Sequence, residues 1–254
     1  MRILAQTRLF LLVFFAFFGA VAQAETLVGS NVDSRMLIGF KVNADAMQSR
    51  VPEGWASIPF PGGPLKGANL LAVLIDRKLE RDAEGKPKSP STSRAMALIG
   101  LGKQIGGDGV RLYVYRIYAT PQDYDPYGNA VQAGISRTTS TEGPANAGRA
   151  RTEVWTVAPQ GGGELGISAR FTSGTRSWVS DEARPYSNMN PDFFRIYRYD
   201  QLVDLVTSTP VGKPLTGTFD FSSTVAELAD VFDGSQEVVA IMDVPVYVRE
   251  IYLP

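Results

Sequence analysis

The chain has 254 residues with no cysteine and no histidine, and its 25 basic and 26 acidic side chains leave a net charge of −1. The missing cysteine excludes disulfides, thiol nucleophiles and soft metal ligands, and the missing histidine excludes a Ser-His-Asp triad and the commonest zinc ligand. A nearly neutral chain also lacks the excess basic charge that a general nucleic-acid partner requires.

The first two dozen residues have the pattern of a secretory signal peptide. Arg2 and Arg8 give a positive start, residues 9–18 are almost continuously apolar, and residues 22–24 match an A-x-A cleavage site. We therefore predict cleavage between Ala24 and Glu25 and a periplasmic or secreted protein. No lipid anchor is expected, because no cysteine follows the apolar run. No later stretch reaches the roughly 18 apolar residues of a membrane helix, so we expect a soluble product without a transmembrane segment.

Alternation of apolar and polar residues predicts that residues 25–254 form one β-rich domain. The expected strands are Met36–Val42, Asn69–Asp76, Arg94–Leu101, Val110–Thr120, Ala130–Thr138, Arg151–Ala158, Glu164–Thr172, Phe193–Tyr199 and Val238–Val248. Turns rich in Gly and Pro separate them, and no linker divides the chain. Many strands at such spacing favour a barrel or a sandwich over parallel strands joined by helices.

Three short helices are expected at the periphery of these strands. Asn43 can cap Ala44–Arg50, which ends before Pro52. Apolar residues at helical spacing predict a helix over Asp200–Ser208. A capping box, Thr224 with Glu227, predicts a helix over Val225–Phe232.

Two polar segments have alternative interpretations. Lys78–Ser93 is typical of a solvated hairpin loop, the alternative being a lid or a partner-docking loop. Residues 123–129 half resemble a calcium loop, but the twelfth position is Gly134 instead of Glu, so a Pro/Gly/Asn turn is the better interpretation. We expect no metal and no cofactor.

One N-terminal segment carries a family resemblance. The sequence from Arg35 to Met47, followed by Val51-Pro52-Glu53, resembles the N-terminal signature of the acetoacetate decarboxylase-like family. In that family an Arg opens a hydrophobic strand, a short helix follows, and a Val/Leu-Pro-Glu motif ends the helix. The resemblance implies a mainly β (α+β) single domain: a partly open, double-sided β-barrel with a few short peripheral helices and an interior pocket.

The family's reactive lysine has no counterpart in this sequence. The resemblance implies a mid-chain pair of adjacent lysines, one of which forms a Schiff base with a β-keto acid. This chain has lysines at 41, 66, 78, 86, 88, 103 and 213, with none adjacent and none from Gln104 to Gly212. The family's Glu is also missing near Gly67, and among the family's site residues only Arg35 is matched. We therefore predict no Schiff-base decarboxylation.

Arginines interleaved with aromatic residues are the remaining signal, at residues 111–118, 193–199 and 247–252. In a strand such an Arg usually covers apolar surface with its stem, although it can also point inward and hold a carboxylate. The candidate ligand-binding residues are Arg35, Arg116, Tyr118 and Arg137. Spacing selects no catalytic residue, although Glu142, Glu153, Glu164 or Asp243 could act as general acid or base if buried.

Three functional hypotheses remain open, and the sequence leaves the oligomeric state undetermined. The first is an exported barrel that binds a small, partly apolar organic acid without catalysing Schiff-base chemistry. The second is a lyase, hydratase or hydrolase that uses an Arg, a Tyr and a carboxylate in the same pocket. The third is a cell-envelope interaction protein that uses the Lys78–Ser93 loop or exposed aromatic residues.

Overall fold

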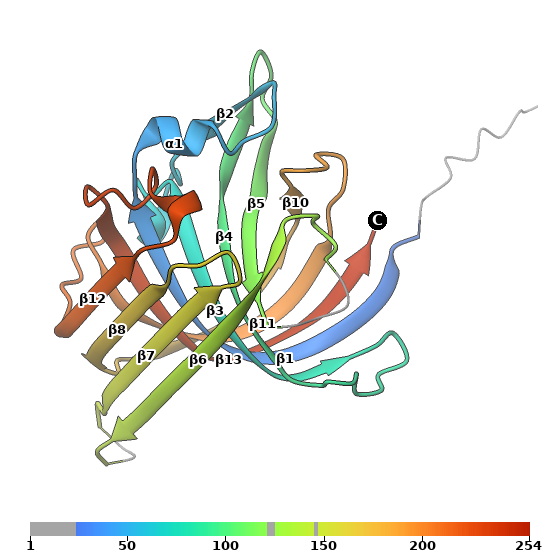
Figure 1. Ribbon diagram of the computed structural model, residues 1–254. Coiled ribbons are helices and arrows are strands. Elements are labelled where there is room, and N and C mark those ends of the chain that lie inside the picture. The colour runs from blue at the N-terminus through green and yellow to red at the C-terminus, as the bar shows by residue number, and fades with distance from the viewer. Residues whose placement is uncertain (1–23, 121–124, 145–146) are drawn as a thin grey trace, which may run out of the picture.

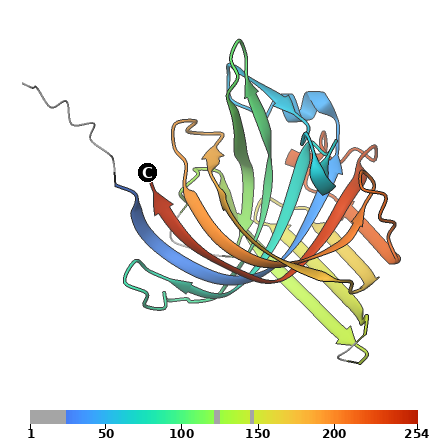
Figure 2. The same ribbon diagram turned by 180° about the vertical axis from the view of Figure 1, so that it is seen from behind.

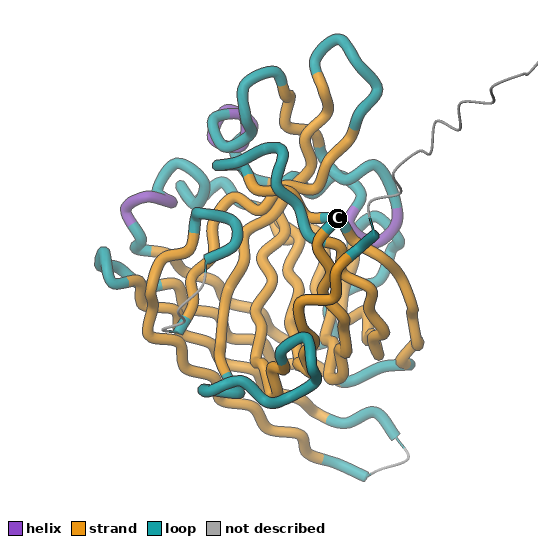
Figure 3. The backbone as a smooth tube through the Cα atoms, turned by 90° about the vertical axis from the view of Figure 1, so that its right-hand side faces the viewer, coloured by secondary structure: helices purple, strands orange, loops and turns teal. Residues whose placement is uncertain are grey.

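The computed structural model describes residues 24–120, 125–144 and 147–254, so residues 1–23 of the predicted signal peptide lie outside the described part. Strands dominate, and the few helices are short and peripheral (Figures 1 and 3). In chain order the strands are β1 (Thr26–Lys41), β2 (Trp55–Ile58), β3 (Leu70–Arg81), β4 (Ser93–Gln104), β5 (Val110–Ala119), β6 (Ala130–Glu142), β7 (Ala150–Pro159), β8 (Leu165–Thr172), β9 (Arg176–Ala183), β10 (Pro185–Ser187), β11 (Ile196–Ser208), β12 (Gly217–Ser223) and β13 (Glu237–Leu253). The helices are α1 (Ala44–Gln48) and the 3-10 turns η1 (Gly63–Leu65) and η2 (Ala226–Leu228).

The strands form one sheet with the order β12-β8-β7-β6-β5-β4-β3-β1-β13-β11-β9, while β2 pairs with β4 and β10 with β5. Pairing is antiparallel except at β5–β6 and β5–β10. The sheet does not close, and β12 and β9 are its edges, which confirms the expected partly open β architecture. The edge strand β9 is exposed and carries Arg176, Asp181 and Glu182, the kind of charged edge that discourages pairing with another chain.

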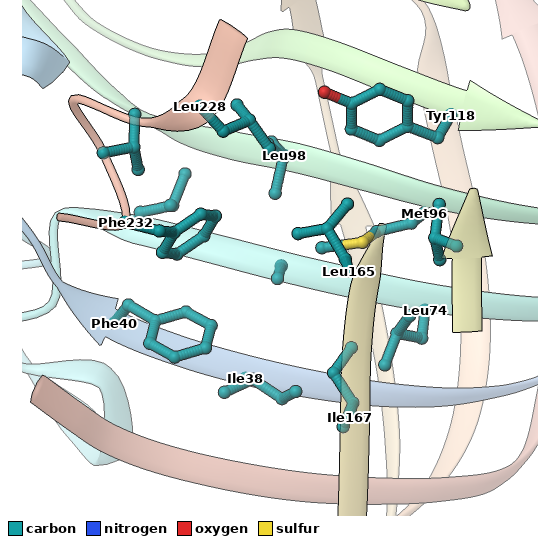
Figure 4. Packing of buried hydrophobic residues seen from close by; sticks show 14 of the residues in the cluster. Ile38, Phe40, Leu74, Met96, Leu98, Tyr118, Leu165, Ile167, Leu228 and Phe232 are labelled. Carbon is teal, nitrogen blue, oxygen red and sulfur yellow. The ribbon is translucent and has the colours of Figure 1, made fainter. Parts of the chain in front are cut away.

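The face of β1, β3 and β4 that packs on the second half of the sheet is called the core face here. Figure 4 shows Ile38, Phe40 and Leu74 meeting Leu165 and Ile167 of β8 across this layer. All five side chains are almost fully buried. Successive residues of a strand point to opposite faces, so alternate residues of the same strands face the other way.

This second face is called the cavity face, and it carries a separate apolar cluster. Leu71, Val73 and Ile75 of β3 pack there with Ala95 and Ala119. β3 is therefore apolar on both faces, which explains why its sequence is a continuous apolar run instead of an alternating one. The long curved strands β1, β13 and β11 extend this face (Figure 2).

Two of the three expected helices differ in the structure. Asn43 does cap α1, since its Oδ1 accepts from the backbone N–H groups of Asp45 and Ala46. The predicted helix Asp200–Ser208 is wrong, because those residues lie in β11, paired with β9 and β13. The sequence of β11 does not alternate regularly between apolar and polar residues, because its pairing with β13 is irregular and many of its side chains are partly buried.

The predicted helix Val225–Phe232 is reduced to the single turn η2. The expected capping box does not form, because Thr224 Oγ1 accepts from the backbone N–H of Glu164, 2.9 Å away. The carboxylate of Glu227 instead reaches Arg116 and Tyr118. The polar segment Lys78–Ser93 does form a hairpin, but its loop is shorter than expected, because residues 78–81 continue β3 and β4 begins at Ser93.

A β-bulge in β5 changes which residues reach which face. Leu98 of β4 pairs with Arg116 and Ile99 pairs with Val114, so Tyr115 is an extra residue on β5. A bulge of this kind shifts the alternation by one residue. Val114 consequently lies on the cavity face, whereas Arg116 and Tyr118 lie on the core face.

Candidate functional site

A cavity of about 660 Å³ occupies the cavity face of the sheet. One side is apolar, formed mainly by Leu71, Val73 and Ile75 of β3, Ala97 and Ile99 of β4, and Val114 of β5. The opposite end is polar and is built by β1, β3, β11 and β13. The volume lies within the range of pockets that hold small organic molecules.

Arg35 lies at this polar end, but its charge is already balanced. Its Nε and Nη2 donate to Oδ2 of Asp33 over 3.0 and 2.6 Å. Its Cζ lies 3.3 Å from the ring centroid of Tyr247, and both members of the ion pair are buried. The side chain thus lines the cavity while its principal partner comes from its own strand.

Arg249 of β13 lines the same cavity and is as buried as Arg35, with 8% of its surface exposed. Its Nε donates to Oδ1 of Asn31 over 2.6 Å, and the Asn31 amide donates in turn to Asp33 over 2.6 Å. Its Cζ lies 4.0 Å from the ring centroid of Tyr197. Among the described residues it forms no ion pair with a carboxylate.

Arg77 of β3 extends the basic end of the cavity. Its Nη1 donates to Oγ of Ser93 over 3.0 Å and lies 3.6 Å from Oε1 of Glu80. Burial lowers the pKa of Arg77, and the nearby Arg249 and Arg35 act in the same direction. Guanidinium groups crowded in this way favour an anion between them.

Tyrosines complete the polar end. The hydroxyls of Tyr127 and Tyr197 lie 2.6 Å apart. Burial, followed by the neighbouring Tyr197, raises the pKa of Tyr127. Burial also opposes ionisation of Tyr197, but Arg249 and Arg195 outweigh it and lower the pKa of its phenol. Burial raises the pKa of Tyr199 to about 12.

The four residues predicted to bind a ligand do not meet in one place. Arg35 lines the cavity, whereas the other three lie on the core face. Arg116 and the Tyr118 hydroxyl both bind Glu227, the hydroxyl over 2.6 Å. Arg116 lines a smaller hollow of about 310 Å³ near α1 and η2, in which its charge is paired.

Arg137 belongs to a buried ionic cluster on the core face. It donates to Asp76, to both oxygens of Glu153 and to the Ser34 hydroxyl. Ser34 directly precedes Arg35 in β1, so Arg35 and Arg137 reach opposite faces of the sheet. The cluster continues from Glu153 through Arg151 to the buried Asp243.

The carboxylates considered as acids or bases are not in the cavity. Glu142 and Glu164 are exposed, and Glu153 and Asp243 lie in the buried cluster. The polar groups that sequence reasoning missed are Asn31, Arg77, Tyr127, Tyr197 and Arg249. Tyr197 and Arg249 do belong to the Arg/aromatic segments, but the sequence could not show which Arg of each segment faces inward.

Replacing Arg35 with Met is expected to destabilise the protein by about 3 kcal/mol or more, because it leaves the buried Asp33 carboxylate without its charge partner. Urea denaturation measures the loss of unfolding free energy. Arg81→Met is the control, since Arg81 lines the same cavity but is exposed. Equal stability of R35M and wild type would show that Asp33 does not depend on Arg35.

Solved structures share this architecture. No model of a known protein family and no curated protein matches the sequence. The structure of the enduracididine biosynthesis enzyme MppR complexed with pyruvate aligns over 92% of this chain and 91% of that chain, with a TM-score of 0.55 and 11% identity. An acetoacetate decarboxylase-like enzyme from Sphingomonas wittichii RW1 aligns over 89% and 91%, with a TM-score of 0.50 and 10% identity. The chain has an acetoacetate decarboxylase-like fold.

Within this acetoacetate decarboxylase-like fold, Lys88 is the one lysine among the described residues that line the cavity, and its side chain is exposed. It lies in the β3–β4 hairpin loop. Asp125 also lines the cavity. Its carboxylate accepts hydrogen bonds from the backbone N–H groups of Tyr127, Gly128 and Ala130, which is the geometry of a turn. No helix among the described residues has the length and apolar character needed to cross a membrane.

Proposed function

We propose that this protein is exported and binds a small, partly apolar organic acid in the cavity, without Schiff-base chemistry. The observation that carries the proposal is the division of the cavity into an apolar side and an end built by Arg35, Arg77 and Arg249. Apolar groups favour the hydrocarbon part of a ligand, and buried guanidinium groups favour its carboxylate. The sequence pattern of residues 1–24 supports export.

The structural neighbours support the same class of ligand by analogy of fold alone. One MppR structure contains pyruvate, and another contains the condensation product of pyruvate and imidazole 4-carboxaldehyde. Because identity to these chains is about a tenth, the fold similarity carries no site residue to this protein.

We expect hexanoate, and not hexanamide, to raise the melting temperature of the mature protein. The two probes share the same hydrocarbon chain, but only hexanoate carries the charge that the arginines would bind. A ligand at 100 times its Kd adds about 2.7 kcal/mol, or roughly 5–10 °C for a domain of this size. Differential scanning fluorimetry measures the shift. Equal responses to both probes, or to neither, would remove the carboxylate from the proposal.

Borohydride treatment in the presence of acetoacetate is expected to leave the protein unmodified. The cavity's lysine among the described residues is exposed in a loop and has no adjacent second lysine. Intact-protein mass spectrometry detects a reduced adduct directly. A stable adduct on Lys88 would establish the Schiff-base chemistry that we expect to be absent.

The Tyr127–Tyr197 pair favours one alternative, an enzyme that removes a proton from a bound acid. Arg249 and Arg195 lower the pKa of the Tyr197 phenol against the opposing effect of burial, and a phenol with a lowered pKa is a reasonable general base. Incubation of 3-hydroxybutanoate in D2O tests this, because loss of the C2 proton signal in NMR would reveal exchange, and Tyr197→Phe should abolish it.

A further inference from the structure

Arg249 differs from the two other arginines described at the polar end of the cavity. Arg35 has Asp33 at 2.6 Å, and Arg77 has Glu80 at 3.6 Å. Arg249 has a neutral amide, Asn31, and the face of a phenol ring, Tyr197, but no ion pair with a described carboxylate. A buried guanidinium without a counter-charge is costly, so an anion at this position is strongly favoured.

Two groups can supply that anion. One is the phenolate of Tyr197, whose ring lies under the Arg249 guanidinium and whose hydroxyl is 2.6 Å from Tyr127. The other is a carboxylate that enters from the cavity, which both Arg249 and Tyr197 line. Only one negative charge is needed to balance Arg249, so the two are alternatives.

The charged and titratable groups that act on Tyr197 come from three segments. β13 contributes Arg249, and the segment before β11 contributes Arg195, which hydrogen-bonds to the Tyr197 hydroxyl. The loop before β6 contributes Tyr127. Asp33 of β1 and Tyr247 of β13 act on Arg249 itself. Burial opposes ionisation of Tyr197, but Arg249 and Arg195 outweigh it, so the net effect lowers the pKa of its phenol.

We propose that Arg249 binds the carboxylate of an aliphatic monocarboxylate ligand. In the free protein, the Tyr197 phenolate is the alternative counter-charge of Arg249. This inference rests on the proposed function. Where Tyr197 is ionised in the free protein, the arriving carboxylate takes its place beside Arg249, and the phenolate oxygen takes one proton from solvent. Binding then forms one O–H bond at Tyr197 and breaks one bond to hydrogen in the water or buffer acid that supplies the proton, and no bond of the ligand changes.

The sign of the resulting pH dependence follows from this exchange. Below the pH at which Tyr197 ionises, the phenol is already protonated, and acid binding takes up no proton. Above that pH, each bound carboxylate takes up close to one proton, so affinity falls by about tenfold per pH unit. A ligand held only by Arg35 or Arg77 would show no such slope.

The first experiment follows tyrosinate absorbance at 295 nm in wild type during alkaline titration, with and without saturating hexanoate. We expect one tyrosine to ionise before the others in the free protein and to ionise at higher pH when hexanoate is bound. Tyr197→Phe should lose the early step, whereas Tyr199→Phe, which removes a phenol from the same cavity, should keep it. An early step that survives in Y197F would overturn the assignment.

The second experiment measures hexanoate binding by calorimetry in two buffers of different ionisation enthalpy. We expect proton uptake close to one above the early titration step and close to zero below it. Arg249→Met should weaken binding at least tenfold, and Arg170→Met, at an exposed β8 residue that does not line the cavity, should leave it unchanged. Equal binding by R249M and wild type would show that Arg249 does not bind the carboxylate.

The two proposals fail in different ways. If wild type binds no acid at any pH, both the proposed function and the role of Arg249 in carboxylate binding are contradicted. The tyrosine titration of the free protein still reports whether the Tyr197 phenolate balances the charge of Arg249. If wild type binds hexanoate without any change in its tyrosine titration, only the exchange at Arg249 is overturned.

Discussion

Replacing Glu153 with Gln is expected to lower the free energy of unfolding by about 3–5 kcal/mol. Glu153 is fully buried and accepts hydrogen bonds from both Arg137 and Arg151, at distances of 2.6–3.1 Å. An amide carries no charge and has one acceptor oxygen. The guanidinium groups of Arg137 and Arg151 would therefore have to share that single neutral oxygen.

Urea denaturation at pH 7 measures this loss, and Glu182→Gln is the matched control. Glu182 also contacts two arginines, Arg184 and Arg198, but at the exposed edge strand β9, where such pairs contribute less than about 1 kcal/mol. Similar losses in both variants would contradict the role that burial has in the Glu153 cluster.

The second large effect is a loss of stability with rising pH that depends on Asp243. Burial, the nearby Glu153 and Asp204 raise the pKa of Asp243 to about 6, although Arg151 opposes them. The folded state therefore binds this proton more tightly than the unfolded state does. The stability it contributes is complete below about pH 4 and is lost as pH rises through 6.

Asp243→Asn is expected to remove this pH dependence. A shift of about two pH units corresponds to about 3 kcal/mol, so the variant should gain stability relative to wild type by about that amount at pH 8 and little at pH 4. Chemical denaturation at both pH values measures the difference, with the exposed β12 residue Asp220, replaced by Asn, as control. Parallel pH profiles for D243N and wild type would show that another group carries the effect.

The sequence predicted most strands because their apolar residues alternate or form buried runs, but it missed strands with other patterns. The first half of β1 contains Asn31, Asp33 and Ser34, polar residues that look like a loop yet are buried. The edge strand β9 is exposed and polar, so it gives no hydrophobic signal. In β11 the apolar residues fit a helical period, and the segment is a strand because it pairs with β9 and β13.

A cavity was predictable from the family resemblance, but the residues that line it were not. The signature around Arg35 indicated an arginine near the interior, which is where the structure places it. Regular strand alternation would place Arg116 on the same face as Val114, but the bulge at Tyr115 shifts the alternation, and a bulge leaves no clear trace in a sequence. The pairing of Arg35 with Asp33, two residues earlier, also depends on side-chain geometry that spacing alone does not give.

Because β1, β3 and β4 send alternate residues to two separate compartments, the residues that pack in the core and those that line the cavity are different, though they are neighbours in sequence. A substitution at Val73 or Ala97 alters the shape of the cavity, while Leu74 and Met96 beside them keep their packing. The shape and polarity of the cavity can therefore diverge among descendants of one ancestral chain while the scaffold is inherited unchanged.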